Sequence, residues 1–154
     1  MFSRLYGTVW QDLYRYAYYY LGNTEDAEDA VQEAALRGFK GLSGLRDHDA
    51  FRGWMFHILS VCCKRKVSEL IQIRRGKTGN DELETLSEEN TDLEVAIMLR
   101  ERIAGLKPDD RQLVLLSVVG GYKSGEIAEI LHLTAGNVRS RLSRILGRLR
   151  VELE

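Results

Sequence analysis

Residues 134–150 read TAGNVRSRLSRILGRLR, a stretch with five arginines and no acidic residue. Its apolar side chains recur at helical spacing and fall within one sector of a helical wheel. Small and polar residues fill the opposite sector, and arginines lie on both sides of it. The stretch therefore predicts an amphipathic helix that packs on one face and presents a basic face outward. The packed face consists of Val138, Leu142, Ile145, Leu146 and Leu149.

The residues in front of this helix predict a second, shorter one. Residues 124–131 have helical character, HLT forms a short turn, and the Thr134 hydroxyl can cap the following helix. A helix, a short turn and a basic helix form the motif that reads duplex DNA, with arginines reaching the phosphates and polar side chains near the helix start meeting base edges. A solvated basic face is the alternative, which the preceding turn and the lack of acids disfavour. The expected DNA contacts are Thr134, Asn137, Arg139, Ser140, Arg141, Ser143 and Arg144.

The rest of the chain predicts an all-α protein with two small helical domains. The 154 residues include a single proline and are 44% hydrophobic, which favours helices with real cores. Residues 76–105 carry 3 basic and 8 acidic side chains, so an acidic middle masks two mildly basic ends and leaves a net charge of −1. We expect domains at residues 1–75 and 93–154, joined by a flexible acidic linker at residues 76–92.

Apolar periodicity and capping residues place the expected helices. Asn23 or Thr24 can cap the second helix, whose apolar set includes Phe39, and a loop is expected at residues 41–49. The helices expected on this basis cover residues 2–20, 24–40, 49–71, 91–105, 110–119, 124–132 and 135–153.

An acidic stripe marks the second expected helix. Glu25, Asp29 and Glu33 are four residues apart, with Asp26 and Gln32 beside them. Like charges at this spacing oppose the helix slightly. The stripe is a solvated face, a docking surface for a basic protein, or a metal cluster.

Two segments resemble a known family. DAEDAVQEAALRGF (residues 26–39), followed by FRGWMFHILSVCCKRK (residues 51–66), resembles region two of bacterial extracytoplasmic-function (ECF) sigma factors. Residues 106–150, which begin LKPDDRQLVLLSVVGGYKSGEIAEILHLTAGNVRSR, resemble region four of the same family. The order and separation of the two segments match as well, and together they cover nearly the whole chain outside the linker.

The resemblance implies a role for each segment. Asp29, Gln32 and Glu33 match a pattern that docks on the β′ clamp helices of RNA polymerase, and the helix at 135–150 matches the reader of the minus-thirty-five promoter element. The loop at 41–49 and the helix start at 51–54 match the part that captures unstacked bases of the minus-ten element. The residues implied for minus-ten DNA are Arg46, Asp47, His48, Asp49, Phe51, Arg52 and Trp54, with Lys64, Arg65 and Lys66 for its phosphates.

The partners implied by the resemblance are core RNA polymerase (β′ clamp helices and β flap), promoter DNA and an anti-sigma factor. We expect no cofactor, no bound metal and no catalytic residue, because the sequence lacks a phosphate-binding loop and the common nucleophile motifs. His57, Cys62 and Cys63 do not converge as metal ligands on one helix. The adjacent cysteines and the lack of a signal peptide or an apolar span favour a cytoplasmic protein without direct membrane insertion.

Two other functions stay open at this stage. A helix-turn-helix regulator would bind duplex DNA without polymerase, and it would footprint an operator alone. An enzyme built on the acidic stripe would hold a metal ion, which elemental analysis would detect.

Overall fold

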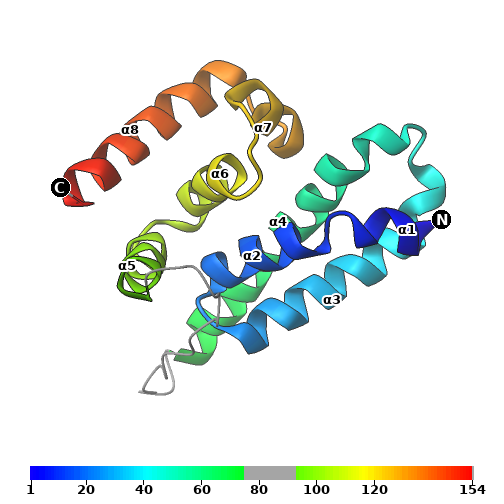
Figure 1. Cartoon of the computed structure of the whole chain (residues 1–154), viewed down its shortest axis with the longest axis horizontal. Helices are drawn as coiled ribbons and strands as arrows, with labels where there is room; N and C mark the ends of the chain where they lie inside the picture. The colour runs from blue at the N-terminus through cyan, green and yellow to red at the C-terminus, as the bar shows by residue number, and fades with distance from the viewer. Residues whose placement is uncertain (75–92, 154) are drawn as a thin grey trace.

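The structure is a computed structural model that describes residues 1–74 and 93–153, and all of its regular elements in those ranges are helical (Figure 1). The expected linker at residues 76–92 lies outside the described residues. The elements are α1 (Phe2–Gly7), α2 (Trp10–Leu21), α3 (Thr24–Gly41), the 3₁₀ turns η1 (Leu42–Gly44) and η2 (His48–Ala50), α4 (Phe51–Arg74), α5 (Leu93–Ala104), α6 (Pro108–Val118), α7 (Ser124–Leu131) and α8 (Ala135–Leu153).

The prediction of one helix over residues 2–20 was wrong, because the chain breaks between α1 and α2. The Thr8 hydroxyl donates a hydrogen bond to the Leu5 carbonyl at 2.6 Å, and α2 begins after Val9. A side chain that bonds its own backbone competes with the helical ladder in this way. The break lets α1 turn toward the start of α4, where Phe2 packs edge-on against Phe51 with ring centroids 5.8 Å apart.

Caps fix the ends of the helices that carry the candidate surfaces. The Asn23 side chain accepts a hydrogen bond from the Asp26 amide at 2.8 Å, so Asn23 rather than Thr24 caps α3. Gly22, at a φ of 86°, ends α2 just before it. Helix α6 begins at Pro108, two residues before the expected start at residue 110, and a first-turn position suits a residue without an amide hydrogen.

The expected loop at residues 41–49 contains two 3₁₀ turns. Asp47 closes the second one by accepting a hydrogen bond from the Asp49 amide at 3.0 Å. The loop therefore has a defined shape where it enters α4.

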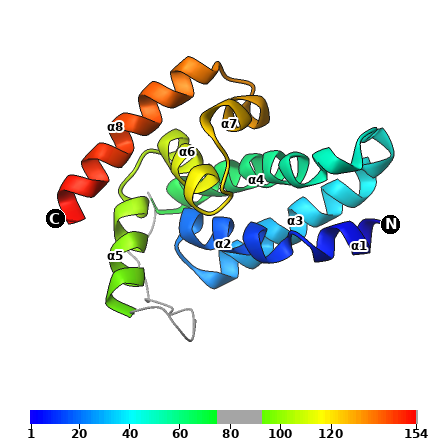
Figure 2. The same ribbon diagram turned by 45° about the horizontal axis from the view of Figure 1, so that its top comes forward.

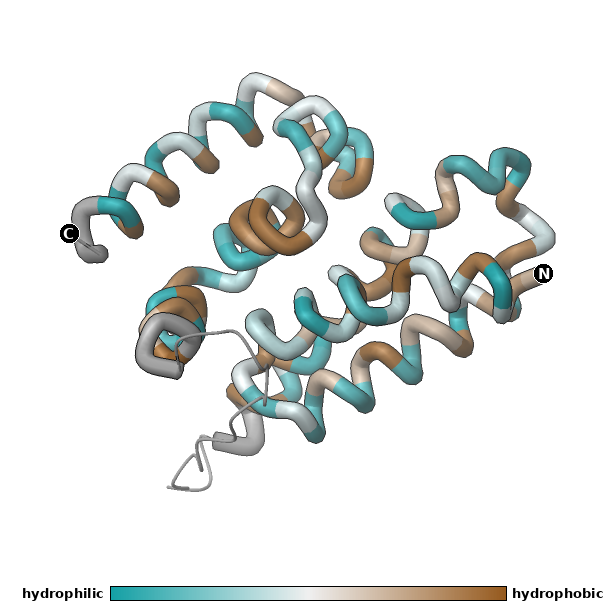
Figure 3. Tube along the Cα trace, in the orientation of Figure 1, coloured by the Kyte–Doolittle hydropathy of each residue, from teal (hydrophilic) through white to brown (hydrophobic). Residues whose placement is uncertain are grey.

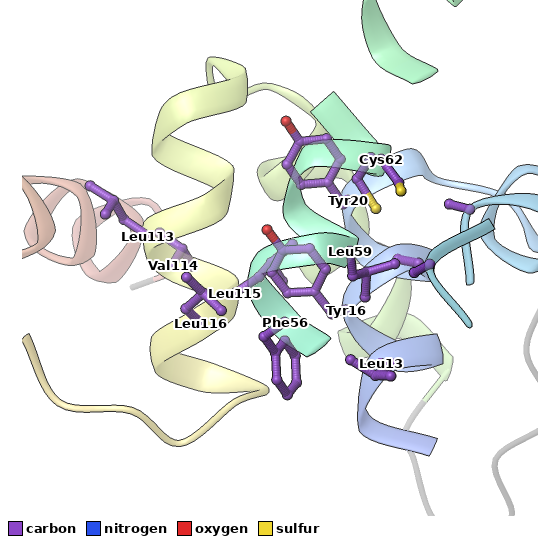
Figure 4. Packing of buried hydrophobic residues seen from close by; sticks show 14 of the residues in the cluster. Leu13, Tyr16, Tyr20, Phe56, Leu59, Cys62, Leu113, Val114, Leu115 and Leu116 are labelled. Atoms are coloured by element: carbon purple, nitrogen blue, oxygen red, sulfur yellow. The ribbon is translucent and has the colours of Figure 1, made fainter. Parts of the chain in front are cut away.

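The N-terminal half, α1 to α4, packs around an aromatic core. Tyr16 and Phe56 are fully buried, with their rings edge to face at 5.8 Å, and Tyr16 stacks on Tyr20 at 5.9 Å. Figure 4 shows these rings between α2 and α4, with Leu115 and Leu116 of α6 on the facing side.

The two halves share one continuous buried cluster, although the sequence predicts separate modules. Helix α2 packs against α5 and α6, and α4 packs against α6 and α7. In Figure 3 the apolar turns of α6 lie toward the centre of the molecule. Hydrogen bonds join the halves as well: Arg111 donates to the Tyr20 carbonyl at 3.0 Å, and the Tyr20 hydroxyl donates to the Pro108 carbonyl at 3.3 Å. In the described residues, the N-terminal and C-terminal halves therefore pack directly against each other.

Candidate nucleic-acid interface

The helix-turn-helix forms as the sequence predicts. Helix α7 ends at Leu131 and is capped by His132, whose φ of 58° is left-handed, and α8 begins after Thr134. The Asn137 amide donates to the Thr134 hydroxyl at 3.3 Å, which confirms the predicted cap. Val138 and Ile145 are 0% and 2% exposed, so the predicted apolar stripe is the packed face of α8.

The opposite face of α8 is open to solvent. Arg139, Arg144 and Arg148 are exposed and form no ion pair within residues 1–74 and 93–153. Asn137, Ser140 and Ser143 are exposed between them. Unpaired arginines flanking a small, polar strip provide phosphate contacts on both sides of a groove.

Arg141 differs from the other arginines of α8. Its guanidinium donates to the Asp110 carboxylate of α6 at 3.0 Å, and its side chain is 29% exposed. The pair ties α8 to α6 inside the C-terminal half. Arg141 therefore contacts α6 as well as facing partly outward, and its expected contact with DNA stays a prediction.

The acidic stripe of α3 lies beside basic residues of α4. Lys66 is 3.6 Å from Asp29, and Glu33 pairs with Arg37 at 3.1 Å and also with Arg65. Asp29 is nevertheless 58% exposed. The stripe is thus a partly neutralised surface that can still meet a basic partner.

Two apolar side chains extend this surface. Leu36 is 62% exposed and Phe39 is 65% exposed. The prediction that Phe39 belongs to the packed side of α3 was wrong, because most of its side chain is exposed, although its ring packs nearly at right angles to that of Phe2 with centroids 5.7 Å apart. Large exposed apolar groups beside charges are typical of an interface, and Leu36 was not among the residues expected there.

The three basic side chains of α4 expected to meet phosphates, Lys64, Arg65 and Lys66, each lie close to a carboxylate of the same molecule. Arg65 and Lys66 face α3, whereas the Lys64 amine lies 2.6 Å from Asp109 of α6. The hydrogen bond from Lys64 lowers the pKa of the Asp109 carboxyl, partly opposed by burial. Lys66 is fifteen residues beyond Phe51 on the same helix, roughly 22 Å along its axis. These three basic residues therefore lie well along α4 from the loop at residues 41–49.

The residues expected at the minus-ten element divide into exposed and packed groups. Arg46, Asp47, His48 and Asp49 are exposed on the loop. Phe51 is 2% exposed, so its ring belongs to the core and supports the loop from below. The Trp54 ring is partly buried and tilts against Phe51 at 6.0 Å. We therefore remove Phe51 from the expected base contacts.

Arg52 contacts both halves of the molecule. Its guanidinium pairs with Asp12 at 3.2 Å, lies 5.0 Å from the Phe56 ring centroid and lies 4.8 Å from that of Tyr122. Tyr122 belongs to the connection between α6 and α7, so a side chain expected to meet DNA also contacts the C-terminal half. The sequence analysis did not identify Tyr122 or Asp12.

Both cysteines lie in the buried part of α4. Cys62 and Cys63 are free and buried, and burial raises the pKa of both thiols. No group of three His, Cys, Asp or Glu residues capable of holding a metal ion occurs among the described residues. Within the same ranges, none of the helices has the length and apolar character needed to span a bilayer.

Comparisons with known proteins agree with the two segments. A family described as Sigma-70 region 2 matches residues 5–70, and one described as Sigma-70, region 4 matches residues 96–149. The chain is 28% identical over 144 residues to the RNA polymerase sigma factor SigV of Bacillus subtilis, covering 93% of this chain and 85% of that protein. It is 26% identical over 152 residues to the ECF RNA polymerase sigma factor SigM of Mycobacterium tuberculosis, covering 96% and 74%.

A solved structure shares the fold. The sigma factor RpoE of Bartonella quintana, in complex with the anti-sigma factor NepR, matches with a TM-score of 0.82 at 21% identity, covering 99% of this chain and 96% of that one. The two family matches lie on the two halves that carry the acidic stripe and the helix-turn-helix. The chain belongs to the extracytoplasmic-function family of bacterial RNA polymerase sigma factors, which direct transcription from specific promoters.

Proposed function

We propose that the two halves divide the work of promoter recognition. Residues 1–75 form the region-two domain, residues 76–92 the linker and residues 93–154 the region-four domain, boundaries that agree with the two family matches. The protein acts by binding alone, since opening a duplex requires contacts to unstacked bases and no covalent chemistry.

The acidic stripe of α3 is the polymerase docking surface. Asp29, Gln32 and Glu33 face basic residues of the β′ clamp helices, and the exposed Leu36 adds apolar area beside them. Lys66 and Arg65 hold the carboxylates in position from the α4 side. Charged groups of this kind set the partner and the orientation of a complex.

Helix α8 reads the minus-thirty-five element. Arg139 and Arg144 contact phosphates or guanine edges, while Asn137, Ser140 and Ser143 approach the bases. Thr134 caps the helix start that enters the groove, and its exposed side chain lies next to the backbone of the DNA. Arg141 acts indirectly, by tying α8 to α6.

The loop at residues 45–50 and the start of α4 capture minus-ten bases. Arg46, Asp47, His48 and Asp49 supply polar contacts, and the Trp54 ring and Arg52 guanidinium provide flat surfaces on which an unstacked base can lie. Arg52 reaches a base only after it leaves Tyr122.

Two further partners follow from the family. An apolar hollow of about 440 Å³ between α2, α5, α6 and α8, lined in part by Leu99, Val118 and Leu149, offers a place for a helix such as the β flap tip. An anti-sigma factor would be a second protein partner, as the complex of RpoE with NepR illustrates for a protein of the same fold.

One observation carries the proposal: Arg139 and Arg144 of α8, which are exposed and form no ion pair within the described residues, and the exposed acids of α3 lie in the two segments that match the two sigma regions. The test is reconstituted transcription with core polymerase on genomic fragments. We expect transcripts from discrete start sites that require the full chain and that are lost with Arg139→Ala/Arg144→Ala. A protein that footprints duplex DNA alone, and gives no transcript with polymerase, would instead be a stand-alone regulator.

A further inference from the structure

An apolar hollow lies between α2 of the N-terminal half and α5, α6 and α8 of the C-terminal half. Helix α5 packs on α2, and α6 packs on both α2 and α8, an arrangement that can be followed in Figure 2. The hollow has a volume of about 440 Å³. Pockets that hold one small molecule measure roughly 300–1,000 Å³. The hollow therefore has the size for a single small ligand rather than for a patch of bilayer.

The walls of the hollow are mostly hydrocarbon. Val114 and Leu115 belong to its lining and are almost completely buried, whereas Val118 is 66% exposed and lies where the hollow meets solvent. The other aliphatic side chains of the lining are Leu99, Ile103, Val119, Leu146 and Leu149. An alkyl chain in this space would exchange contact with water for contact with these side chains, which is the main favourable term for apolar ligands.

Arginines supply all of the charge in the lining. Arg15 comes from α2, Arg102 from α5 and Arg150 from α8, and no acidic residue lines the hollow in the described part of the chain. Arg15 and Arg150 are exposed, so their charge lies at the edge of the apolar space. Single arginines often cover apolar surface with their stems. Three of them from three helices, with no acid between them, also attract an anion.

We propose that this hollow binds the anion of a fatty acid, with its alkyl chain inside and its carboxylate among Arg15, Arg102 and Arg150. The planar guanidinium group of arginine matches the two oxygens of a carboxylate. The proposal does not depend on the function proposed above, because the ligand binds the free chain. It has a consequence for that function, however. A helix of polymerase that docks in the same hollow and a bound fatty acid exclude each other.

The first experiment titrates the free chain with decanoate, below the concentration at which decanoate forms micelles, and follows binding by isothermal titration calorimetry. We expect one decanoate to bind per chain. The melting temperature should also rise with decanoate concentration, because a ligand that binds only the folded state stabilises that state. Titration without saturation, or saturation at several decanoate molecules per chain, would overturn the proposal.

Arg150→Met tests the contribution of charge. Arg15 and Arg102 also interact with other groups of the protein, so Arg150 is the arginine to replace, and methionine keeps an unbranched apolar side chain. We expect this variant to bind decanoate about fivefold more weakly. Its affinity for 1-decanol, the neutral alcohol of the same chain length, should equal that of wild type.

Arg148→Met is the matched control for this substitution. Arg148 is an exposed arginine of the same helix that does not line the hollow. Arg148→Met should bind decanoate and 1-decanol as wild type does. Equal losses of decanoate affinity in the two variants would mean that net charge acts at a distance, and unchanged affinity in Arg150→Met would mean that its guanidinium is not involved. Either result would contradict the proposed site.

Val118→Trp tests the location. A larger side chain at this exposed position of the lining fills the hollow, whereas Val118→Ala leaves it open. We expect Val118→Trp to lose at least tenfold in affinity for both decanoate and 1-decanol, and Val118→Ala to stay within about twofold of wild type. Melting temperatures without ligand show whether each variant is folded. A folded Val118→Trp that binds decanoate as wild type does would place the ligand elsewhere and overturn the proposal.

Other occupants of the hollow would give different results. A second copy of the chain would appear in sedimentation as a dimer that Val118→Trp dissociates, without binding of decanoate. A polymerase helix as the sole occupant would appear as reduced polymerase affinity in Val118→Trp, again without binding of decanoate. Both results overturn the fatty-acid assignment. A chain that binds decanoate as described but does not bind polymerase would support this inference and refute the function proposed above.

Discussion

The arginines of the two halves have different surroundings. In the N-terminal half, Arg52 and Arg65 each pair with a carboxylate, and Arg52 also lies against two aromatic rings. In α8, Arg139 and Arg144 are exposed and without an ion pair in the described part of the chain. Among the described residues, the basic face of α8 therefore has arginines free of internal ion pairs, whereas Arg52 at the start of α4 is engaged in contacts within the molecule.

The largest effect is expected where the halves share a core. Phe56 is fully buried and touches Tyr16, Tyr122 and Arg52. Phe56→Ala should lower the free energy of unfolding by about 3–5 kcal/mol, because it leaves a cavity at the junction. Chemical denaturation followed by circular dichroism measures this loss.

Tyr16→Phe is the matched control for that substitution. The Tyr16 hydroxyl is buried without a hydrogen-bond partner in the described residues, so its removal should change stability by less than about 1 kcal/mol. A loss as large as that of Phe56→Ala would mean that the hydroxyl has a partner, such as an internal water molecule.

The next largest effect is expected on duplex binding when Arg139 and Arg144 of α8 are replaced. Arg139→Ala/Arg144→Ala should weaken minus-thirty-five duplex binding by about 2–3 kcal/mol and reduce the salt dependence by roughly two phosphate contacts. Fluorescence anisotropy over a range of salt concentrations measures both. Stability should stay unchanged, since neither side chain makes an ion pair in the described ranges.

Arg141→Ala should show the opposite pattern. Loss of its pair with Asp110 should reduce the stability of the C-terminal half by about 1 kcal/mol. The salt dependence of duplex binding should stay as in wild type. If Arg141→Ala lowers that dependence as Arg144→Ala does, Arg141 contacts phosphate and the distinction within α8 is wrong.

The smallest effect belongs to the exposed bridge between Lys64 and Asp109. Asp109→Asn should cost about 0.2–1 kcal/mol, and less at high salt. Because Lys64 lowers the pKa of Asp109, the contribution is present above the unfolded pKa of about 4 and is lost as the pH falls through the lower folded value. Between pH 7 and about pH 4, wild type should therefore be more stable than Asp109→Asn by a constant amount, and the difference should shrink as the pH falls further toward 3.

Local features could be predicted from the sequence. The apolar stripe of α8, the Thr134 cap and the Asn23 cap depend on residues a few positions apart, and all three are confirmed. The break at Thr8 depends on a hydrogen bond from the Thr8 hydroxyl to the nearby backbone. The spacing of apolar residues carries no information about such a bond, so it could not predict the break.

Contacts between the halves could not be predicted in this way. The contact of Arg52 with the Tyr122 ring joins residues far apart in the sequence, and the contact of His57 with Ile130 spans 73 residues. The residue types alone do not predict these contacts. An arginine such as Arg52 is equally suited to binding DNA and to packing on an aromatic ring. The burial of Phe51 and the exposure of Phe39 also depend on where α1 packs, and that follows from the break at Thr8.

The central claim is that α3 carries the protein to polymerase while α8 reads DNA independently. Asp29→Lys/Glu33→Lys tests it most directly, with Glu28→Lys/Glu101→Lys as a control of equal charge change at exposed positions outside the docking set. Affinity of the full chain for core polymerase and for minus-thirty-five duplex is measured for each protein, together with its melting temperature. We predict that the first variant loses polymerase binding and keeps duplex binding, and that the control keeps both. Unchanged polymerase affinity in the first variant would contradict the account.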